Sequence, residues 1–203
     1  MTPRVGVLAL QGDVAEHQRI LTGLGVQAPR VRTPEDLAGV DALVIPGGES
    51  TAIAQLSVVL DVLEPLQKAA QSGMPMYGSC AGMILLADDL TSDQPPPARR
   101  QPRIGGLDIT VRRNAFGRQV DSFETDLEVP ALGAAPLRAV FIRAPWVERV
   151  GNAVHVLATV EGGPADGRIV AVVQDALLAT SFHPELTGDR RMHEYFVELV
   201  RAA

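Results

Sequence analysis

The stretch PMYGSCAGMILLA, residues 75–87, contains the local pattern that decides the fold. Residues 75–77 are a short apolar run typical of a buried strand, and residues 81–87 have the composition of a helix. One glycine lies two positions before Cys80 and another lies two positions after it. Glycines allow a tight turn where side chains would collide, so we expect the chain to pass from strand to helix at Cys80.

Upstream of this stretch, strands and helices alternate. Apolar runs predict strands at residues 5–10, 27–32 and 42–45. Helical patterns follow each strand: one from an N-cap at Asp13 to about Leu24, one starting at Thr33-Pro34, and one over residues 51–71 that Pro65 can divide. This alternation predicts an α/β fold in three layers, with an open, mostly parallel or mixed sheet and helices on both faces.

Downstream of residue 91 the pattern changes. Residues 92–103 are rich in proline, which fixes φ and lacks an N–H donor, so we expect a surface loop. Strands are then predicted at 107–111, 139–143, 153–160, 169–174 and 177–182, with a final helix at 190–201. Neither flank of the loop is large enough to fold alone, so residues 1–203 are expected to form one domain.

Composition excludes several classes of protein. The net charge of −6 argues against a nucleic-acid binder, which would carry a basic face. No apolar run approaches the roughly 20 residues that span a bilayer, and the run at residues 5–10 is too short for a signal peptide. The single cysteine cannot form an internal disulfide. We therefore expect a soluble cytoplasmic protein that does not contact a membrane.

Cys80 is the strongest candidate for a catalytic group. At a strand-to-helix turn its thiol would lie at a helix N-terminus, where free N–H groups favour a thiolate and can hold a developing oxyanion. The alternative is that Cys80 is a small buried apolar residue, as most lone cysteines are. The flanking glycines favour the nucleophile.

A thiolate nucleophile needs a base, and the base needs an orienting group. His183 and Glu185 are two residues apart at the end of an apolar run, so their side chains project to the same side of an extended chain. They can act as base and orienter. His155 alternates with valines and is expected to face solvent, whereas His17 and His193 are expected to be structural or surface positions.

The run PGGEST, residues 46–51, follows a predicted buried strand. Its two glycines let the backbone approach a ligand and present amide protons, at the end of the strand where open sheets bind ligands. A phosphate-binding loop is excluded because the lysine and the glycine spacing are missing. A plain turn before a helix capped by Ser50 is the alternative.

Six motifs in order along the chain resemble one family. They are GVLALQG (6–12), PGGEST (46–51), GSCAG (78–82), RNAFGRQ (113–119), FIRAP (141–145) and SFHPELT (181–187). The strand-to-helix turn at Cys80, together with His183-Pro184-Glu185, resembles the class I, or triad, glutamine amidotransferases. The whole set is similar to the glutaminase subunits of pyridoxal 5′-phosphate synthase, the PdxT/SNO family, and the resemblance implies their flavodoxin-like fold.

The resemblance implies a glutaminase that hydrolyses L-glutamine to L-glutamate and ammonia. The ammonia would pass to a separate synthase subunit that builds pyridoxal 5′-phosphate, in a hetero-oligomer with a synthase dodecamer decorated by glutaminase subunits. Neither a cofactor nor a metal is implied. The roles carried over by motif are a triad of Cys80, His183 and Glu185, an oxyanion hole at Gly48 and Ala81, and a glutamine site of Gly48, Glu49, Ser50, Arg113, Ile142 and Arg143.

Some assignments stay open. Arg113 or Arg143 suits the carboxylate of glutamine and Glu49 its ammonium, but Arg143 could also be a surface ion-pair partner. Arg112 and Arg113 point opposite ways if the chain is extended, and the motif favours Arg113. Arg118 is expected to be structural or at a subunit interface. The loop at 94–103 is longer and richer in proline and arginine than the family suggests.

Two other functions compete with the glutaminase. A peptidase or deglycase of the same fold is disfavoured by the His-x-Glu pair and the glutamine-site motifs. A non-catalytic subunit that only regulates a partner is disfavoured because Cys80, His183 and Glu185 are all present.

Overall fold

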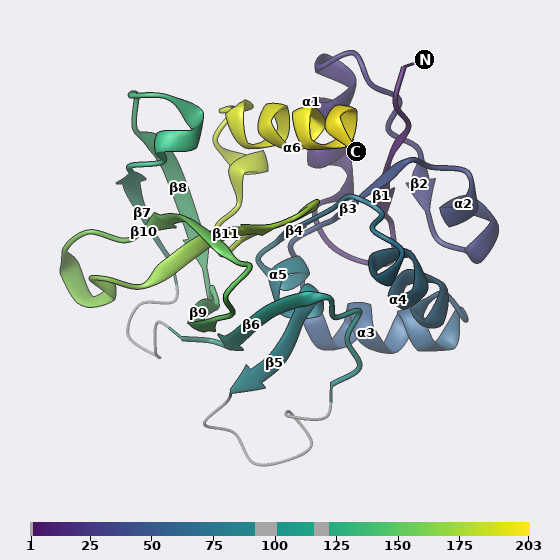
Figure 1. Ribbon diagram of the computed structural model, residues 1–203, viewed down its shortest axis with the longest axis horizontal. Coiled ribbons are helices and arrows are strands. Elements are labelled where there is room, and N and C mark those ends of the chain that lie inside the picture. The colour runs from purple at the N-terminus through teal and green to yellow at the C-terminus, as the bar shows by residue number, and fades with distance from the viewer. Residues whose placement is uncertain (1, 92–100, 116–121) are drawn as a thin grey trace.

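The computed structural model describes residues 2–91, 101–115 and 122–203 (Figure 1). Its first half alternates strands and helices: β1 Val5–Leu8, α1 Val14–Gly23, β2 Arg30–Val31, α2 Pro34–Ala38, β3 Ala42–Ile45, α3 Ser50–Val59, α4 Leu63–Gln71, β4 Met76–Ser79 and α5 Ala81–Leu86. The second half is mostly strands: β5 Ala87–Thr91, β6 Leu107–Arg112, β7 Ser122–Leu127, β8 Leu137–Ile142, β9 Trp146–Val150, β10 His155–Thr159, β11 Ile169–Gln174 and β12 Leu177–Thr180. Short 3-10 helices occur at η2 Pro130–Leu132, η3 Gly163–Ala165 and η4 Pro184–Leu186, and α6 Arg191–Ala202 ends the fold.

One mixed sheet runs through the molecule in the order β2-β1-β3-β4-β12-β11-β9-β6-β5, with β10 paired to β11. The strands from β2 to β12 are parallel. Beyond β12, the pairs β12–β11, β11–β9 and β9–β6 are antiparallel, and β6–β5 is parallel. The strands β7 and β8 form a separate antiparallel ribbon. The predicted fold class is therefore confirmed.

Helices cover both faces of the parallel part of the sheet (Figure 1). On one face, Leu21 of α1 and Phe196 of α6 pack with Val5, Val7 and other strand residues in one hydrophobic cluster. On the other face, residues of α2, α3, α4 and α5 pack with the alternate strand positions, including Leu8, Leu43 and Ile45. Because both faces are buried, these strands read as continuous apolar runs.

The structure differs from the sequence-based expectations in several elements. The helical pattern at 51–71 does divide, but between Val59 and Leu63, and Pro65 lies in the first turn of α4, where a proline is tolerated. The strands β5, β7 and β9 were not predicted. Each contains exposed charged or polar positions and lacks a long apolar run, which hides a strand from a search for hydrophobic patterns.

The predicted surface loop falls mainly on residues 92–100, which lie outside the described residues. Its last part departs from the expectation, because Gln101 is buried. The Gln101 side chain donates to the Ser50 carbonyl at 3.0 Å and accepts from the Ser50 hydroxyl at 3.4 Å. This end of the loop is therefore attached to the start of α3. Within the described part of the chain, no helix is long and apolar enough to cross a membrane.

Candidate active site

Cys80 lies in a sharp turn between β4 and α5, with φ of 48° and ψ of −98°. A Cβ atom on Gly78 would lie 2.4 Å from the backbone carbon of Gly82, and one on Gly82 would lie 2.3 Å from the Ile45 carbonyl oxygen. The backbone can therefore pack this closely only with glycine at both positions. The Cys80 N–H donates to the Thr180 carbonyl at 2.7 Å. Such a bond helps to hold a backbone conformation that costs about 1–3 kcal/mol.

His183 and Glu185 form a hydrogen-bonded pair beside this turn. His183 lies between the end of β12 at Thr180 and the start of η4, which carries Glu185. The distance from His183 Nδ1 to Glu185 Oε1 is 2.7 Å, and both side chains are buried. An ionised carboxylate only accepts, so Nδ1 is the donor. This leaves Nε2 of His183 to act on Cys80, whose interaction with the ring helps to raise the pKa of His183.

Opposing effects set the protonation of this pair. Burial lowers the pKa of His183, but hydrogen bonds to Asp13, Cys80 and Glu185 outweigh it, and the pKa is raised well above its ordinary value. Burial raises the pKa of Glu185, and the interaction with His183 opposes that rise. His183 is therefore a strong acceptor for a proton from the Cys80 thiol.

Asp13 differs from its predicted role as a helix cap. It occupies the N-cap position of α1, but its side chain makes no capping hydrogen bond. Its Oδ2 lies 3.4 Å from His183 Nδ1 instead. Asp13, His183 and Glu185 thus place three possible metal-ligand atoms within 4.8 Å of one another, a grouping that sequence spacing did not reveal. The bond to Glu185 already occupies the His183 nitrogen of that group.

The PGGEST loop lies opposite Cys80. Glu49, not Ser50, caps α3: its carboxylate accepts from the Thr51 N–H at 3.0 Å and the Ala52 N–H at 2.7 Å. Burial would raise the pKa of Glu49, but these two N–H donors hold it below its ordinary value. Arg113 Nη2 lies 3.8 Å from Glu49 Oε1 and donates to the Thr51 hydroxyl at 3.1 Å. Glu49 of this loop and Arg113, which follows β6, thus place opposite charges side by side.

The loop that follows β1 holds the PGGEST loop in place. The Glu49 N–H donates to the Gln11 side-chain oxygen at 2.7 Å. The Asp13 N–H donates to the Gly47 carbonyl at 3.2 Å. The loop after β1 and the loop after β3 are neighbours because β1 and β3 are paired and parallel, so their carboxyl ends meet at one edge of the sheet.

These elements enclose a cavity of about 400 Å³, here called the Cys80 cavity. Every predicted site residue except Glu185 lines it: Gly48, Glu49, Ser50, Cys80, Ala81, Arg113, Ile142, Arg143 and His183. Glu185 lies behind His183. The sequence analysis missed Gln11, Asp13, Ile84 and Asn114, which also line the cavity. Gln11 and Asp13 follow the first strand of a parallel sheet. Their position at the carboxyl end of that strand could have indicated that they lie near the site.

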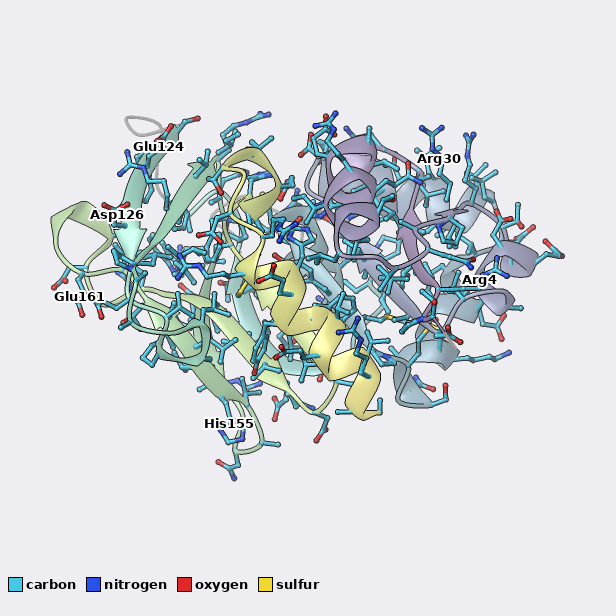
Figure 2. The ribbon with its side chains drawn as sticks, turned by 90° about the horizontal axis from the view of Figure 1, so that it is seen from above. Arg4, Arg30, Glu124, Asp126, His155 and Glu161 are labelled. Carbon is cyan, nitrogen blue, oxygen red and sulfur yellow. The ribbon has the colours of Figure 1, made fainter. Side chains whose placement is uncertain are left out.

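The other histidines and arginines considered in the sequence analysis do not line the Cys80 cavity where the structure describes them. His155 is exposed at the periphery of the molecule, as expected (Figure 2). Arg112 forms an ion pair with Glu148, so it points away from Arg113. Arg118 lies outside the described residues. His17 and His193 are completely buried, which excludes the surface position that the sequence left open.

Known proteins resemble this chain over nearly its full length. The SNO glutamine amidotransferase family matches residues 7–202. A pyridoxal 5′-phosphate synthase subunit PdxT from Nocardia farcinica is 59% identical over 201 residues, which cover 99% of this chain and 87% of the relative. The protein of the same name from Rhodococcus jostii is 59% identical, with 98% of each chain covered.

Solved structures agree. A crystal structure of a glutamine amidotransferase superposes with a TM-score of 0.86 at 46% identity, covering 97% of this chain and 98% of the other. A putative GMP synthase subunit from Thermoplasma acidophilum, at 17% identity and a TM-score of 0.68, shares the fold and covers 100% of this chain and 96% of its own. This chain belongs to the SNO glutamine amidotransferase family.

Proposed function

We propose that this chain is a glutaminase that hydrolyses L-glutamine to L-glutamate and ammonia, and that it supplies the ammonia to a pyridoxal 5′-phosphate synthase. One observation carries the proposal. Cys80 and His183 meet in a cavity of about 400 Å³, Glu185 supports His183 from behind, and the rim contains both an acidic and a basic side chain.

In the proposed reaction, His183 takes the proton of the Cys80 thiol and the thiolate attacks the carboxamide carbon of glutamine. The backbone N–H groups of Gly48 and Ala81 would stabilise the oxyanion. His183 then gives its proton to the departing ammonia, which leaves a glutamyl thioester. Water hydrolyses the thioester with His183 as base, and glutamate departs. Glu185 holds Nδ1 protonated throughout, so that Nε2 performs each transfer.

The far end of glutamine carries an ammonium and a carboxylate. The Glu49 carboxylate is the acidic group on the rim of the Cys80 cavity, and its side chain is 55% exposed although it caps α3. Arg113 and Arg143 line the same cavity and can donate to the carboxylate. We assign the ammonium to Glu49, and we assign Ser50 and Ile142 to the walls that orient the substrate.

The partner is proposed from the relatives, whose printed name is a subunit of pyridoxal 5′-phosphate synthase. We further propose that copies of this chain decorate a dodecamer of the synthase. We also propose that residues 1–203 form a single domain and that the protein acts in the cytoplasm.

The test is glutamate release from L-glutamine by the wild-type chain and by Cys80→Ala, each with and without the synthase subunit. We expect release that rises with the synthase and is absent from the alanine variant. No release by the wild-type complex, with both proteins folded and bound to each other, would instead indicate a non-catalytic regulatory subunit.

A further inference from the structure

Behind the proposed triad lies a buried group of polar side chains that the reaction described above does not use. His17 comes from α1, His193 from α6 and Ser79 from the end of β4, and all three are fully buried. We call His17 and His193 the histidine pair. A hydrogen bond of 2.8 Å joins His17 Nδ1 to His193 Nε2. A buried polar group away from water is costly unless it is hydrogen-bonded, so this pair requires an explanation.

The histidine pair leads to the second carboxylate oxygen of Glu185. While Oε1 accepts from His183, Oε2 is buried and has no hydrogen-bond partner among the described residues. His17 Nε2 lies 3.6 Å from this oxygen and 3.1 Å from the Ser79 hydroxyl. The ring nitrogen of His17 is thus placed between a serine hydroxyl and the far side of the proposed orienting carboxylate.

The chain of contacts determines which nitrogens carry protons. If His17 Nδ1 were the donor to His193, neutral His193 would hold its proton on Nδ1, a buried atom with no acceptor in the described structure. His17 Nε2 would then turn a lone pair toward the Glu185 carboxylate. In the opposite arrangement His193 Nε2–H donates to His17 Nδ1, and His17 Nε2–H donates to the Ser79 hydroxyl oxygen, with Oε2 of Glu185 3.6 Å from the same nitrogen. The second arrangement leaves no buried N–H without an acceptor.

Both rings are neutral in this arrangement. Burial, followed by the charges of His193 and His183, lowers the pKa of His17 well below its ordinary value. Burial alone lowers the pKa of His193 to about 4. A neutral imidazole offers an N–H dipole to a buried carboxylate without adding a second cation beside His183.

We propose that His17 is a positioning residue for the glutaminase reaction: its Nε2–H stabilises the ionised form of Glu185, and His193 holds His17 in the tautomer that does so. This inference rests on the proposed function. The titratable groups that face Glu185 are His183, His17, Asp13 and Tyr77, with His193 behind His17. Because Tyr77 is buried and its pKa is raised well above the ordinary value by burial, it stays neutral. The N–H of His17 is therefore a neutral donor 3.6 Å from Oε2.

The first test is made on the wild-type chain and needs no activity. Proton-detected long-range ¹⁵N spectra of the wild-type chain distinguish the protonated nitrogens of its four histidines, and the His193→Gln and His155→Gln variants assist assignment. We expect His17 and His193 to be neutral and protonated on Nε2 at pH 7. A cationic His17, or one protonated on Nδ1, would overturn the proposal.

The second test compares variants in the complex with the synthase. His17→Leu removes the donor, whereas His17→Gln keeps an N–H near the same place. We expect His17→Leu to lower kcat about tenfold, because the buried Glu185 carboxylate loses the N–H dipole that lies 3.6 Å away, with KM for glutamine within about twofold. Without the donor the pKa of Glu185 rises further, so the low-pH limb of kcat moves to higher pH. His17→Gln is expected to recover most of both effects.

His193 provides the matched comparison one step further away. His193→Leu frees the tautomer of His17 and is expected to lower kcat by about threefold, while His193→Gln restores a donor and most of the rate. Equal losses in the leucine and glutamine variants with an unshifted pH profile would mean that both histidines serve packing only. If the wild-type protein releases no glutamate, the proposed function is wrong. The first test does not depend on activity, so it still shows which nitrogens of His17 and His193 carry protons.

Discussion

The back and the rim of the Cys80 cavity are built in different ways. At the back, Cys80, His183 and Glu185 are each no more than 6% exposed, and close backbone packing holds the nucleophile turn. At the rim, Ile142 and Arg143 are exposed, and the Glu49 carboxylate is 55% exposed although it accepts from N–H groups at the start of α3. Proton transfer tolerates little displacement, whereas a charged substrate can be held by side chains that adjust. We therefore expect substitutions at the back of the cavity to lower kcat and substitutions at the rim to raise KM for glutamine.

The largest effect should come from Glu185→Gln at the back. The amide keeps the shape but cannot support a protonated Nδ1 on His183 as a carboxylate does, and it favours the wrong tautomer. We expect kcat to fall about a thousandfold with little change in KM. Glutamate release under saturating glutamine measures this, and Glu198→Gln, an exposed change on α6, serves as the control. Unchanged turnover would remove Glu185 from the triad.

Gly82→Ala tests the backbone packing behind Cys80. The new Cβ would lie 2.3 Å from the Ile45 carbonyl oxygen, so a strand or the helix must shift. We expect the free energy of unfolding to fall by about 3 kcal/mol, measured by urea denaturation. Gly23→Ala in α1, whose new Cβ has its nearest neighbour at 4.0 Å, should not destabilise the protein. Equal stability of the two variants would contradict the close packing described above.

Arg113→Ala tests the rim. Loss of a guanidinium that can bind the substrate carboxylate should raise KM for glutamine about tenfold and change kcat less. The adjacent Arg112 is the matched control, because it pairs with Glu148 on the other side of the strand. If Arg112→Ala raises KM as much as Arg113→Ala does, Arg113 has no special role in binding.

Asp13→Asn should have the smallest effect, because Asp13 lies between the back and the rim and is only partly buried. Asp13 helps to raise the pKa of His183, so removing its charge lowers that pKa. A raised histidine pKa stabilises the fold below the unfolded value, and this contribution is lost as pH rises through the folded value. In the variant both this loss and the high-pH limb of kcat should therefore move to lower pH. Glu35→Gln, an exposed change on α2, is the control for net charge, and identical profiles for the two variants would show that Asp13 does not act on His183.

The parallel half of the fold was predictable because its strands are buried on both faces. The run at residues 42–45 was predicted with the bounds that β3 has, and the strand-to-helix turn at Cys80 was placed correctly. The edge strand β5, with exposed Asp88 and Asp89, and the half-exposed strand β7 were missed, because pairing and not burial makes them strands. The sequence offered Ser50 as a cap of α3 only in the alternative interpretation of the loop, and the structure has Glu49 as the cap, because its carboxylate reaches the Thr51 and Ala52 N–H groups.

The features of the site that could be predicted from the sequence are those that depend on short spacings along the chain. Two glycines around Cys80 set the turn. The two-residue interval predicted that His183 lies beside Glu185, and it does, although Glu185 lies in η4 and not in the extended chain that was expected. Only the tertiary structure decided the partners of that pair. Asp13, which follows β1, lies 3.4 Å from His183, which follows β12 of the same sheet, and His17 meets His193 across a separation of 176 residues. No local pattern encodes these contacts, because they arise where helices from opposite ends of the chain pack on the same face of one sheet.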